Sequence, residues 1–331
     1  MALWVGCYTA DMDGHGEGIV ALRRGVDGGY EPVAPATPVA SPSFLAMHPS
    51  LPVLYAVSEK AGHVHAFHHD GGGALGALGE VGIAGELACH VAVAPDGAFL
   101  VVCCWGDGEV LLFELNADGS LGRRHAGPAS TDPYGQARQS RAHACLMLGG
   151  GRMVTAEMGH DSLRFWRFTP ERGLELQGTV TLPHGSGPRH FAYASNGLVY
   201  VNTEHSAQVA VLRPVGEWLE PVGLFPVSAG GVRPGDAVAE ICLDPAESHL
   251  YVGVRGSDRI CRLRLDADGI PAPLDEFPCG GDWPRHHCFD GDRLVVALQL
   301  SDAMATFDLE AGTTPWRLTA TGSPTCLLPG R

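Results

Sequence analysis

The stretch GPRHFAYASNGLVYVNTE, residues 187–204, carries side chains that could do acid–base chemistry at the open end of an apolar hairpin. Two apolar runs flank a turn at Ser195-Asn196-Gly197, which predicts two short antiparallel strands. Arg189 and His190 begin the first strand, and Glu204 follows the second. An imidazole or a carboxylate can move a proton, and a guanidinium can hold an anion. The question is which elements bring such groups together.

The hairpin belongs to a repeat. Each copy has an apolar strand, a turn, a second apolar strand, a polar turn and an alternating third strand, followed by a weaker fourth strand. A repeat of roughly 45 to 53 residues predicts a solenoid or a propeller. The six copies begin at Ser41, Leu87, Ser140, Gly187, Val238 and Trp283.

The two ends of the chain supply a seventh copy. GSPTCLLPG near the C-terminus resembles a first strand, and LWVGCYT and GIVALRRG near the N-terminus resemble a second and a third. A blade shared by both termini closes the ring and removes a free sheet edge. The sequence therefore predicts an all-β fold, a seven-bladed β-propeller with four antiparallel strands per blade, as one domain over residues 1–331.

The repeat also predicts which residues meet. The first strand of a blade lines the central channel and the second runs back, so the start of one and the end of the other share a face of the disc, here called the mouth. First-strand starts supply Cys89, His90, Arg141, His143, Arg189, His190, Glu240, Arg285 and His286. Second-strand ends supply Tyr8, Glu59, Trp105, Glu157, Glu204, Arg255 and Gln299. Asp161, Asp258 and Asp302 lie in tight turns, where we expect each carboxylate to cap its own backbone.

Composition limits the function classes. Lys and Arg number 22 and Asp and Glu number 37, so the net charge is −15, which argues against nucleic-acid or anionic-membrane partners. No run reaches the ~18 apolar residues that cross a bilayer. The N-terminus lacks the pattern of a signal peptide, and most of the ten cysteines lie in apolar runs. We therefore expect a cytoplasmic protein with buried free thiols, while its oligomeric state stays open.

Several motifs in order resemble one family. CHVAVAPDG, GDGEVLLFELNADG, AHACLML, GSGPRHFA, VAEICLDP, LYVGVRGSD and WPRHHCFD are similar to those of the lactonase family with a seven-bladed β-propeller. That family includes propeller-type 6-phosphogluconolactonases and is related to the carboxy-cis,cis-muconate cyclases. The resemblance covers essentially the whole chain. It implies catalytic roles for His143, Arg189, Glu240 and Arg255.

The chain departs from the family pattern at several mouth positions. Arg141 stands where the family has a His, Cys104-Trp105 where it has Asn-Tyr, and Leu298-Gln299 where it has Asn-Gln. The family also has an Asp near Glu157. The lining of the pocket therefore differs more than the scaffold does.

Together with the mouth residues, the resemblance implies a lactone hydrolase, most similar to 6-phosphogluconolactonase, that acts on a small anionic sugar lactone without a cofactor. Either Glu240 or His143 serves as base and the other as acid, while Arg189 and Arg255 hold the anion. Substrate-binding roles are expected for His90, Arg141, His190, Glu204, Arg285 and Glu157. Alternatives are a muconate-cyclase-like lactonising enzyme, a non-catalytic propeller that binds a metabolite or protein, and a metal lactonase using His90, His143 and His190.

Overall fold

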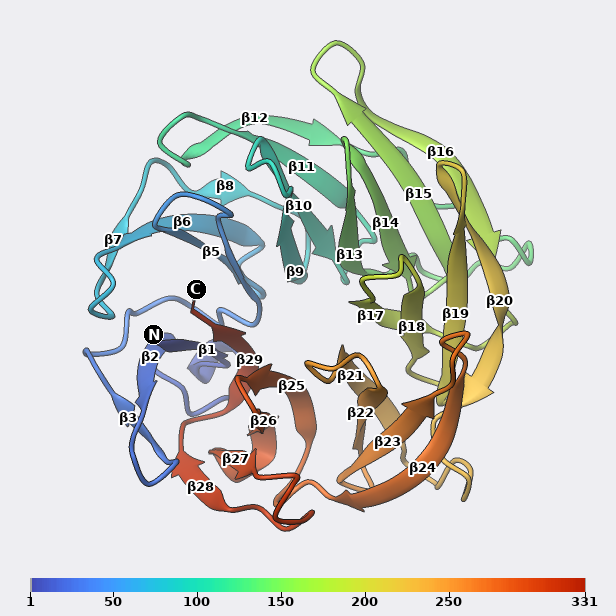
Figure 1. The fold of residues 1–331 in the computed structure, drawn as a ribbon. Helices are drawn as coiled ribbons and strands as arrows, with labels where there is room; N and C mark the ends of the chain where they lie inside the picture. The colour runs from blue at the N-terminus through green and yellow to red at the C-terminus, as the bar shows by residue number, and fades with distance from the viewer. Residues whose placement is uncertain (1, 331) are drawn as a thin grey trace.

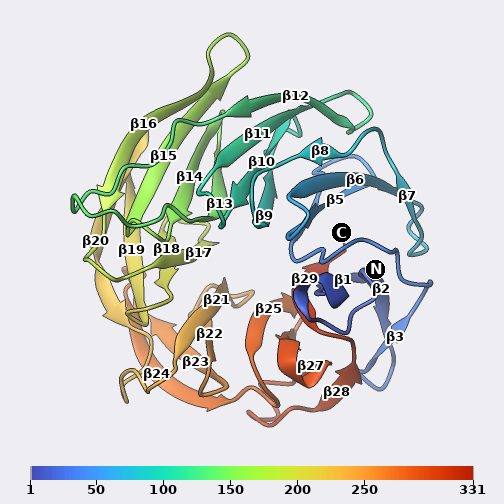
Figure 2. The same cartoon turned by 180° about the vertical axis from the view of Figure 1, so that it is seen from behind.

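A computed structural model describes residues 2–330; Met1 and Arg331 lie outside the described residues. Seven antiparallel sheets stand around a central axis, with the inner strands of the blades nearest the centre (Figure 1). The same ring is seen from its other face in Figure 2. The prediction of a seven-bladed β-propeller is confirmed.

Each blade is a sheet of four strands, and blade 2 has a short fifth strand, β8 (Gly82–Ile83), that pairs with β6. Blades 2 to 7 begin at the positions that the repeat predicts. The strands of blades 2, 3 and 4 are β4 (Leu45–Met47), β5 (Val53–Ser58), β6 (His63–His69), β7 (Leu75–Ala77); β9 (Ala88–Val93), β10 (Phe99–Cys104), β11 (Val110–Leu115), β12 (Leu121–Ala126); and β13 (Ala142–Gly149), β14 (Arg152–Glu157), β15 (Ser162–Thr169), β16 (Gly173–Thr181). Those of blades 5, 6 and 7 are β17 (Pro188–Tyr193), β18 (Val199–Thr203), β19 (Gln208–Val215), β20 (Trp218–Pro226); β21 (Ala237–Leu243), β22 (His249–Arg255), β23 (Arg259–Leu265), β24 (Pro271–Pro278); and β25 (Pro284–Asp290), β26 (Arg293–Leu298), β27 (Ala303–Phe307), β28 (Arg317–Ala320).

Both termini build blade 1, as the sequence predicts. Its order is β29 (Pro324–Pro329), β1 (Leu3–Cys7), β2 (Ile19–Arg24), β3 (Tyr30–Pro32). Strand β29 is therefore the inner strand of this blade and pairs with β1 from Leu3↔Pro329 to Cys7↔Pro324. The ring closes through hydrogen bonds between the two ends of the chain, which leaves blade 1 without an open inner edge.

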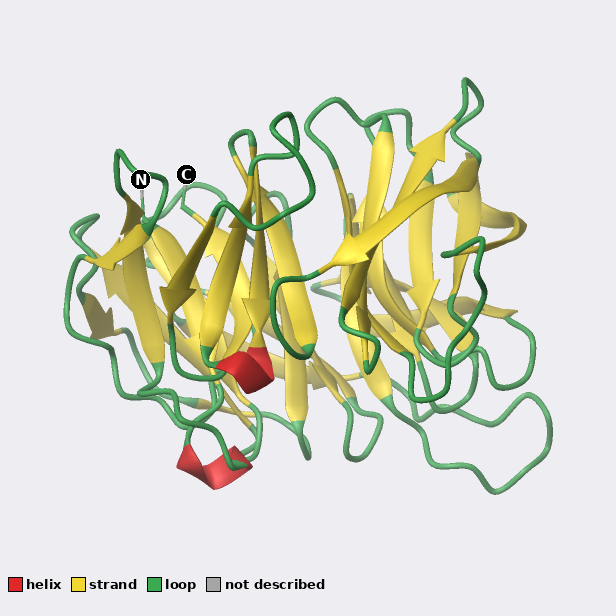
Figure 3. Cartoon of the chain, turned by 90° about the horizontal axis from the view of Figure 1, so that it is seen from below, coloured by secondary structure: helices red, strands yellow, loops and turns green. Residues whose placement is uncertain are grey.

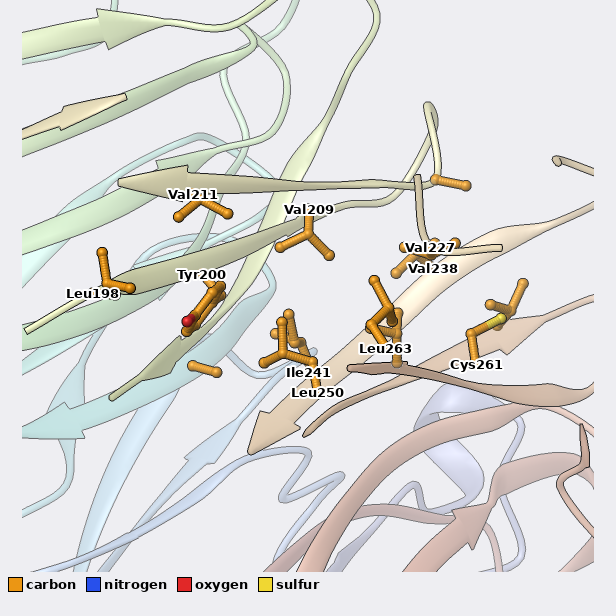
Figure 4. Close-up of a cluster of buried hydrophobic side chains, with 14 of the residues drawn as sticks. Leu198, Tyr200, Val209, Val211, Val227, Val238, Ile241, Leu250, Cys261 and Leu263 are labelled. Carbon is orange, nitrogen blue, oxygen red and sulfur yellow. The ribbon is translucent and has the colours of Figure 1, made fainter. Parts of the chain in front are cut away.

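Apolar side chains from adjacent blades form the core. Between blades 5 and 6, Tyr200, Val211 and Leu250 are fully buried in one cluster, and Figure 4 shows them pointing into the space between the two sheets. Burying an aliphatic side chain of this size stabilises the fold by about 1.5–3 kcal/mol. Because both faces of the inner strands are covered in this way, polar side chains in these strands gather at the strand ends and along the channel.

The turn aspartates tie neighbouring strands together at the mouth. Asp161, Asp258 and Asp302 all adopt positive φ, between 49° and 52°. Their carboxylates accept hydrogen bonds from backbone N–H groups at the start of the next inner strand. The N–H of Gly187 donates to Asp161, that of Trp283 to Asp258 and that of Ser323 to Asp302, each at 2.8 Å. They therefore connect successive blades, whereas the sequence predicted a cap within each turn.

Two short 3-10 helices, η1 (Ala10–Met12) and η2 (Gln299–Ser301), follow second strands at the mouth. The side view shows these helices away from the edge where both termini lie (Figure 3). No helix among the described residues is long and apolar enough to cross a membrane. All ten cysteines are free thiols.

Candidate active site

A cavity of about 220 Å³ lies at the mouth, and side chains from several blades line it. Its wall consists of Tyr8, Met12, Glu59, Leu87, Cys89, Trp105, His143, Arg189, Glu204, Arg255 and Arg285. A larger hollow of about 380 Å³, near Trp4 and Pro52, contains two histidines and no other ionisable side chain in its wall. Another hollow of about 380 Å³ has Lys60, Glu86, Asp107 and Glu109 in its wall. Of these three cavities, the one at the mouth combines several arginines with an imidazole.

A β-bulge at the mouth end of the inner strand sets the orientation of the key residues. In blade 5, Pro188 pairs with Thr203 and Phe191 with Val201, so Arg189 and His190 together oppose the single residue Asn202. Six of the seven inner strands show this shift of register at their mouth ends. A bulge lets two consecutive side chains avoid the usual alternation of faces. Neighbouring residues therefore both turn toward the channel and form two layers.

The upper layer lies against the cavity and contains a buried ion-pair triad. Glu204 Oε2 is 2.9 Å from Arg189 Nε and 2.8 Å from Arg255 Nη2. Burial alone would raise the pKa of Glu204, but Arg255 and Arg189 outweigh it and hold the pKa below its usual value. Burial, and then the charge of Arg189, lower the pKa of Arg255 to about 10. All three groups are therefore charged at neutral pH.

Backbone carbonyls fix the two arginines of the triad in place. Arg189 donates from Nη1 to the carbonyl oxygen of Ala239 in the adjacent blade. Arg255 donates from Nε to Ala237 at 3.3 Å and from Nη2 to Val238 at 3.4 Å. Because the guanidinium groups are held before any ligand arrives, they need little rearrangement to bind an anion.

A second group of charged and polar side chains in the wall comes from blades 7, 1 and 2. Arg285 donates from Nη2 to the hydroxyl of Tyr8 at 2.6 Å, and that hydroxyl donates to Glu59 Oε2 at 3.0 Å. Arg285 Nη2 also lies 3.7 Å from the same Glu59 oxygen. Burial is the main cause that raises the pKa of Tyr8, so its phenol stays protonated and can donate a hydrogen bond.

His143 is the one imidazole in the cavity wall. The residue is buried, and its Nδ1, itself buried, makes no hydrogen bond within residues 2–330. Burial and then the charge of Arg189 lower the pKa of His143 well below its usual value. A neutral imidazole that lines the cavity beside three guanidinium groups is able to accept a proton from a molecule there.

The lower layer continues down the channel and is organised around Glu240. His190 Nδ1 lies 2.7 Å and His286 Nε2 3.1 Å from Glu240 Oε2, while Oε1 accepts the N–H of Ile241 at 3.0 Å. His190 also packs against the ring of His143, with centroids 5.1 Å apart. Glu240 thus orders the imidazoles beneath the cavity but does not line it.

Phe44 fills the rest of this lower layer. Its ring centroid lies 4.1 Å from that of His90 and 5.6 Å from those of His190 and His286. Burial, and then the charges of neighbouring groups, lower the pKa of His90 well below its usual value. The channel below the cavity is therefore lined by rings rather than by open water-binding groups.

The structure divides the ten predicted site residues into two groups. Five line the cavity: His143, Arg189, Glu204, Arg255 and Arg285. Five lie outside its wall: His90, His190 and Glu240 in the layer beneath, Arg141 at the rim, and Glu157 in the body of blade 4. Arg141 stacks on Trp105, with its guanidinium carbon 3.5 Å from the ring centroid.

Glu157 was placed at the mouth by the alignment of the repeats, but it lies one residue before the mouth position. In blade 5 the backbone N–H of Glu204 donates to the carbonyl oxygen of Gly187, just before the inner strand. The equivalent hydrogen bond in blade 4 runs from the N–H of Met158 to the carbonyl oxygen of Arg141, so Met158 and not Glu157 is the counterpart of Glu204. Glu157 instead accepts hydrogen bonds from Ser140 Oγ at 2.8 Å and from the N–H of Arg141 at 2.6 Å. A slip of one residue along a strand moves a side chain to the opposite face, and Glu157 does not line the cavity.

Other residues of the wall were absent from the predicted site. Tyr8, Glu59 and Trp105 occupy the same second-strand position as Glu204 and Arg255; the repeat placed them at the mouth, but no binding or catalytic role was predicted for them. Met12 and Leu87 have no such signal, because η1 folds over the mouth and Leu87 precedes an inner strand. Within residues 2–330, no group of three or more His, Cys, Asp or Glu side chains is arranged to hold a metal ion.

The buried neutral histidines predict that the protein loses stability as the pH falls. His90 and His143 have folded-state pKa values below the ~6.5 of an exposed histidine, and burial lowers that of His286 to about 4. Below about pH 6.5 the unfolded chain binds protons that the folded chain does not. Each such histidine then removes up to about 1.4 kcal/mol per pH unit until its folded pKa is reached.

Urea unfolding at pH 7.5, 6.5 and 5.5 measures this effect. We expect the free energy of unfolding of His90→Gln to fall less steeply with decreasing pH, because one of the buried neutral histidines has been removed. His68, exposed on β6, provides the matched control, and His68→Gln should leave the slope unchanged. A free energy of unfolding that stays constant from pH 7.5 to 5.5 would contradict the neutral state of the layer.

Comparison with known proteins shows the family to which the chain belongs. The family described as "Lactonase, 7-bladed beta-propeller" matches residues 2–329. A 6-phosphogluconolactonase of Bacillus subtilis is 28% identical over 303 residues, which cover 87% of this chain and 84% of that protein. A 6-phosphogluconolactonase of Formosa agariphila is 24% identical over 334 residues, with 94% and 93% covered.

A solved structure shows the same architecture. The periplasmic gluconolactonase of Pseudomonas aeruginosa superposes with a TM-score of 0.88 at 25% identity, over 99% of this chain and 98% of that one. Other relatives of similar identity, including a 26% identical protein of Lactococcus lactis, are uncharacterised. The scaffold is thus shared along nearly the whole chain.

Proposed function

The chain belongs to the lactonase family of seven-bladed β-propellers, and we propose that it hydrolyses an anionic sugar lactone. The proposed reaction is like that of the relatives named 6-phosphogluconolactonase and belongs to carbohydrate metabolism. The observation that carries the proposal is the composition of the mouth cavity. A neutral imidazole, His143, shares its wall with three guanidinium groups, Arg189, Arg255 and Arg285. These are the groups that lactone hydrolysis requires: a base for water, and donors for the negative oxygen and for the anionic substituent.

In this mechanism His143 acts as the base. It accepts a proton from water as the water oxygen bonds to the lactone carbonyl carbon, and the negative charge that develops on the carbonyl oxygen lies against the guanidinium groups. When the ring C–O bond breaks, His143 returns its proton to the departing ring oxygen. One water is consumed, and the product hydroxy acid ionises to a carboxylate and releases one proton.

Two features support His143 rather than Glu240 as the base. His143 lines the cavity, whereas Glu240 does not. The oxygens of Glu240 are already engaged by His190, His286 and the backbone of Ile241. Glu240 therefore acts as a positioning residue that holds His190 against the ring of His143.

Purified protein should open 6-phosphogluconolactone faster than a blank without enzyme, and this is the first substrate to test. Because the lactone also opens spontaneously, the quantity measured is the initial rate above the blank, with and without EDTA. The proposed base is a side chain, so the rate should be equal in both. If the rate equals the blank for 6-phosphogluconolactone and for other anionic and neutral sugar lactones, the proposal fails. If ring closure of an unsaturated dicarboxylate is catalysed instead, the lactonising alternative is correct.

A further inference from the structure

The charges around the cavity are nearly balanced. Three guanidinium groups and two carboxylates line it, Arg189, Arg255, Arg285, Glu59 and Glu204, which leaves one net positive charge. The other ionisable groups of the wall contribute none. Burial keeps Tyr8 and Cys89 protonated by raising their pKa values, and His143 is neutral because its pKa is lowered.

The charged residues just outside the wall nearly balance one another. Arg141 stacks on the wall residue Trp105, and Lys60 follows the wall residue Glu59 and donates to the backbone carbonyl oxygen of Asp11. The layer beneath contributes the carboxyl group of Glu240 and imidazoles of lowered pKa. At the rim, Asp11 and Glu86 are acidic and lie next to the wall residues Met12 and Leu87. The attraction that a ligand meets in the cavity is therefore that of about one positive charge.

The wall is also divided into two sides. Arg189, Arg255 and Arg285 come from blades 5, 6 and 7, whereas Leu87 and Trp105 come from blade 3 and Met12 from the loop of blade 1. Polar N–H donors thus face an aromatic and aliphatic surface across the cavity. Such a surface suits the C–H face of a sugar ring, since aromatic side chains provide rigid apolar contact area.

We propose that the natural ligand of this cavity is a sugar-acid lactone that carries one carboxylate, bound with the carboxylate on the arginine side and the ring against Trp105. The inference rests on the proposed lactone hydrolysis and narrows its substrate class. One carboxylate neutralises the cavity, whereas a phosphate monoester carries a charge of about −1.5 to −2 at pH 7 and would face Glu59 and Glu204 with its excess charge. Hydrolysis adds water across the ring ester bond and yields a hydroxy dicarboxylate and one proton. That product has one more negative charge than the cavity balances, which favours its release.

The test compares three lactones of different charge at pH 7: D-glucono-1,5-lactone, which is neutral, D-glucaro-1,4-lactone, with one carboxylate, and 6-phosphogluconolactone. We expect the highest kcat/KM for D-glucaro-1,4-lactone, by roughly tenfold over each of the others, which corresponds to the removal of one unbalanced charge. A kcat/KM that is highest for 6-phosphogluconolactone overturns the inference and leaves the proposed function intact.

A charge variant separates the effect of charge from that of ring size. Glu204→Gln adds one unit of positive charge to the wall without changing its shape. The ratio of kcat/KM for 6-phosphogluconolactone to that for D-glucaro-1,4-lactone should then rise roughly tenfold. Glu220→Gln, on the exposed outer strand β20, is the matched control and should leave the ratio unchanged. If Glu204→Gln does not fold, Glu59→Gln makes the same change of charge from the opposite side. An unchanged ratio in a folded variant overturns the inference.

Binding measurements distinguish this inference from the proposed function. Isothermal titration calorimetry with freshly dissolved lactones on His143→Gln records affinity without turnover. If the wild-type protein hydrolyses no lactone while His143→Gln binds the three lactones in the expected order, the charge preference is supported and the hydrolase assignment fails. If the wild-type protein hydrolyses a lactone and the order of affinities is reversed, the hydrolase assignment is supported and the charge preference is overturned.

Discussion

His143→Gln is expected to lower kcat/KM for an accepted lactone by about 10²–10⁴-fold, the usual contribution of a positioned base. The side chains are similar in size, but the amide cannot accept a proton from water. Because the three arginines remain in the wall, affinity for the substrate should change much less than kcat. Initial rates above the blank, measured over a range of substrate concentrations, separate the two constants.

Three further variants test whether the loss of activity is specific to His143 and whether Glu240 could be the base instead. His68→Gln, on the surface of β6, should retain the full rate. Glu240→Gln should reduce kcat by less than His143→Gln, because Glu240 acts through His190. Arg189→Lys keeps the charge but loses the planar fork, so it should raise KM. If His143→Gln folds normally and keeps its rate while Glu240→Gln loses it, the base is Glu240 and not His143.

Removal of residues 323–331 is expected to abolish cooperative folding. The deletion takes away β29, the inner strand of blade 1, and with it the pairing to β1 and the packing of Leu327 against blade 7. It also removes the N–H and the hydroxyl of Ser323, which donate to Asp302 at 2.8 and 3.0 Å. The exposed edge of β1 would then be free to pair with another chain. Thermal unfolding and size-exclusion chromatography measure the loss.

A rearranged chain tests whether the cause is the missing strand. The N–H of Gly330 donates to the carbonyl oxygen of Ala2 at 2.8 Å, so the end of β29 lies beside the start of β1. Placing residues 323–331 before residue 1, through a short turn, restores the same pairing in a hairpin. This permuted chain should fold and melt as one cooperative unit. A deletion mutant with an unchanged melting temperature would contradict the role of β29 in closing the ring.

Much of the architecture follows from the sequence, because it depends on local periodicity. Strands covered on both faces require continuous apolar runs such as those of β5 and β10, and these recur with the repeat. The antiparallel order of strands within a blade then places residues from distant parts of the chain at one face, including Arg189, Glu204 and Arg255. The shared blade of the two termini is predictable for the same reason, since each end supplies the strands that the other lacks.

The composition of the cavity wall depends on the tertiary structure. Regular alternation would turn Arg189 and His190 to opposite faces, and only the bulge opposite Asn202 directs both inward and places them at different depths. Strand register decides that Met158, and not Glu157, occupies the mouth position of blade 4. Contacts between blades decide that Glu240 is held by His190 and His286 beneath the cavity while His143 lies in its wall. Hydrophobic periodicity determines which segments become strands, but a bulge is one residue of extra backbone that the periodicity does not encode. At the bulge of blade 5, Asn202 accepts the N–H of His190 and donates to the carbonyl oxygen of Ala239 in the next blade, so these contacts arise only in the folded structure.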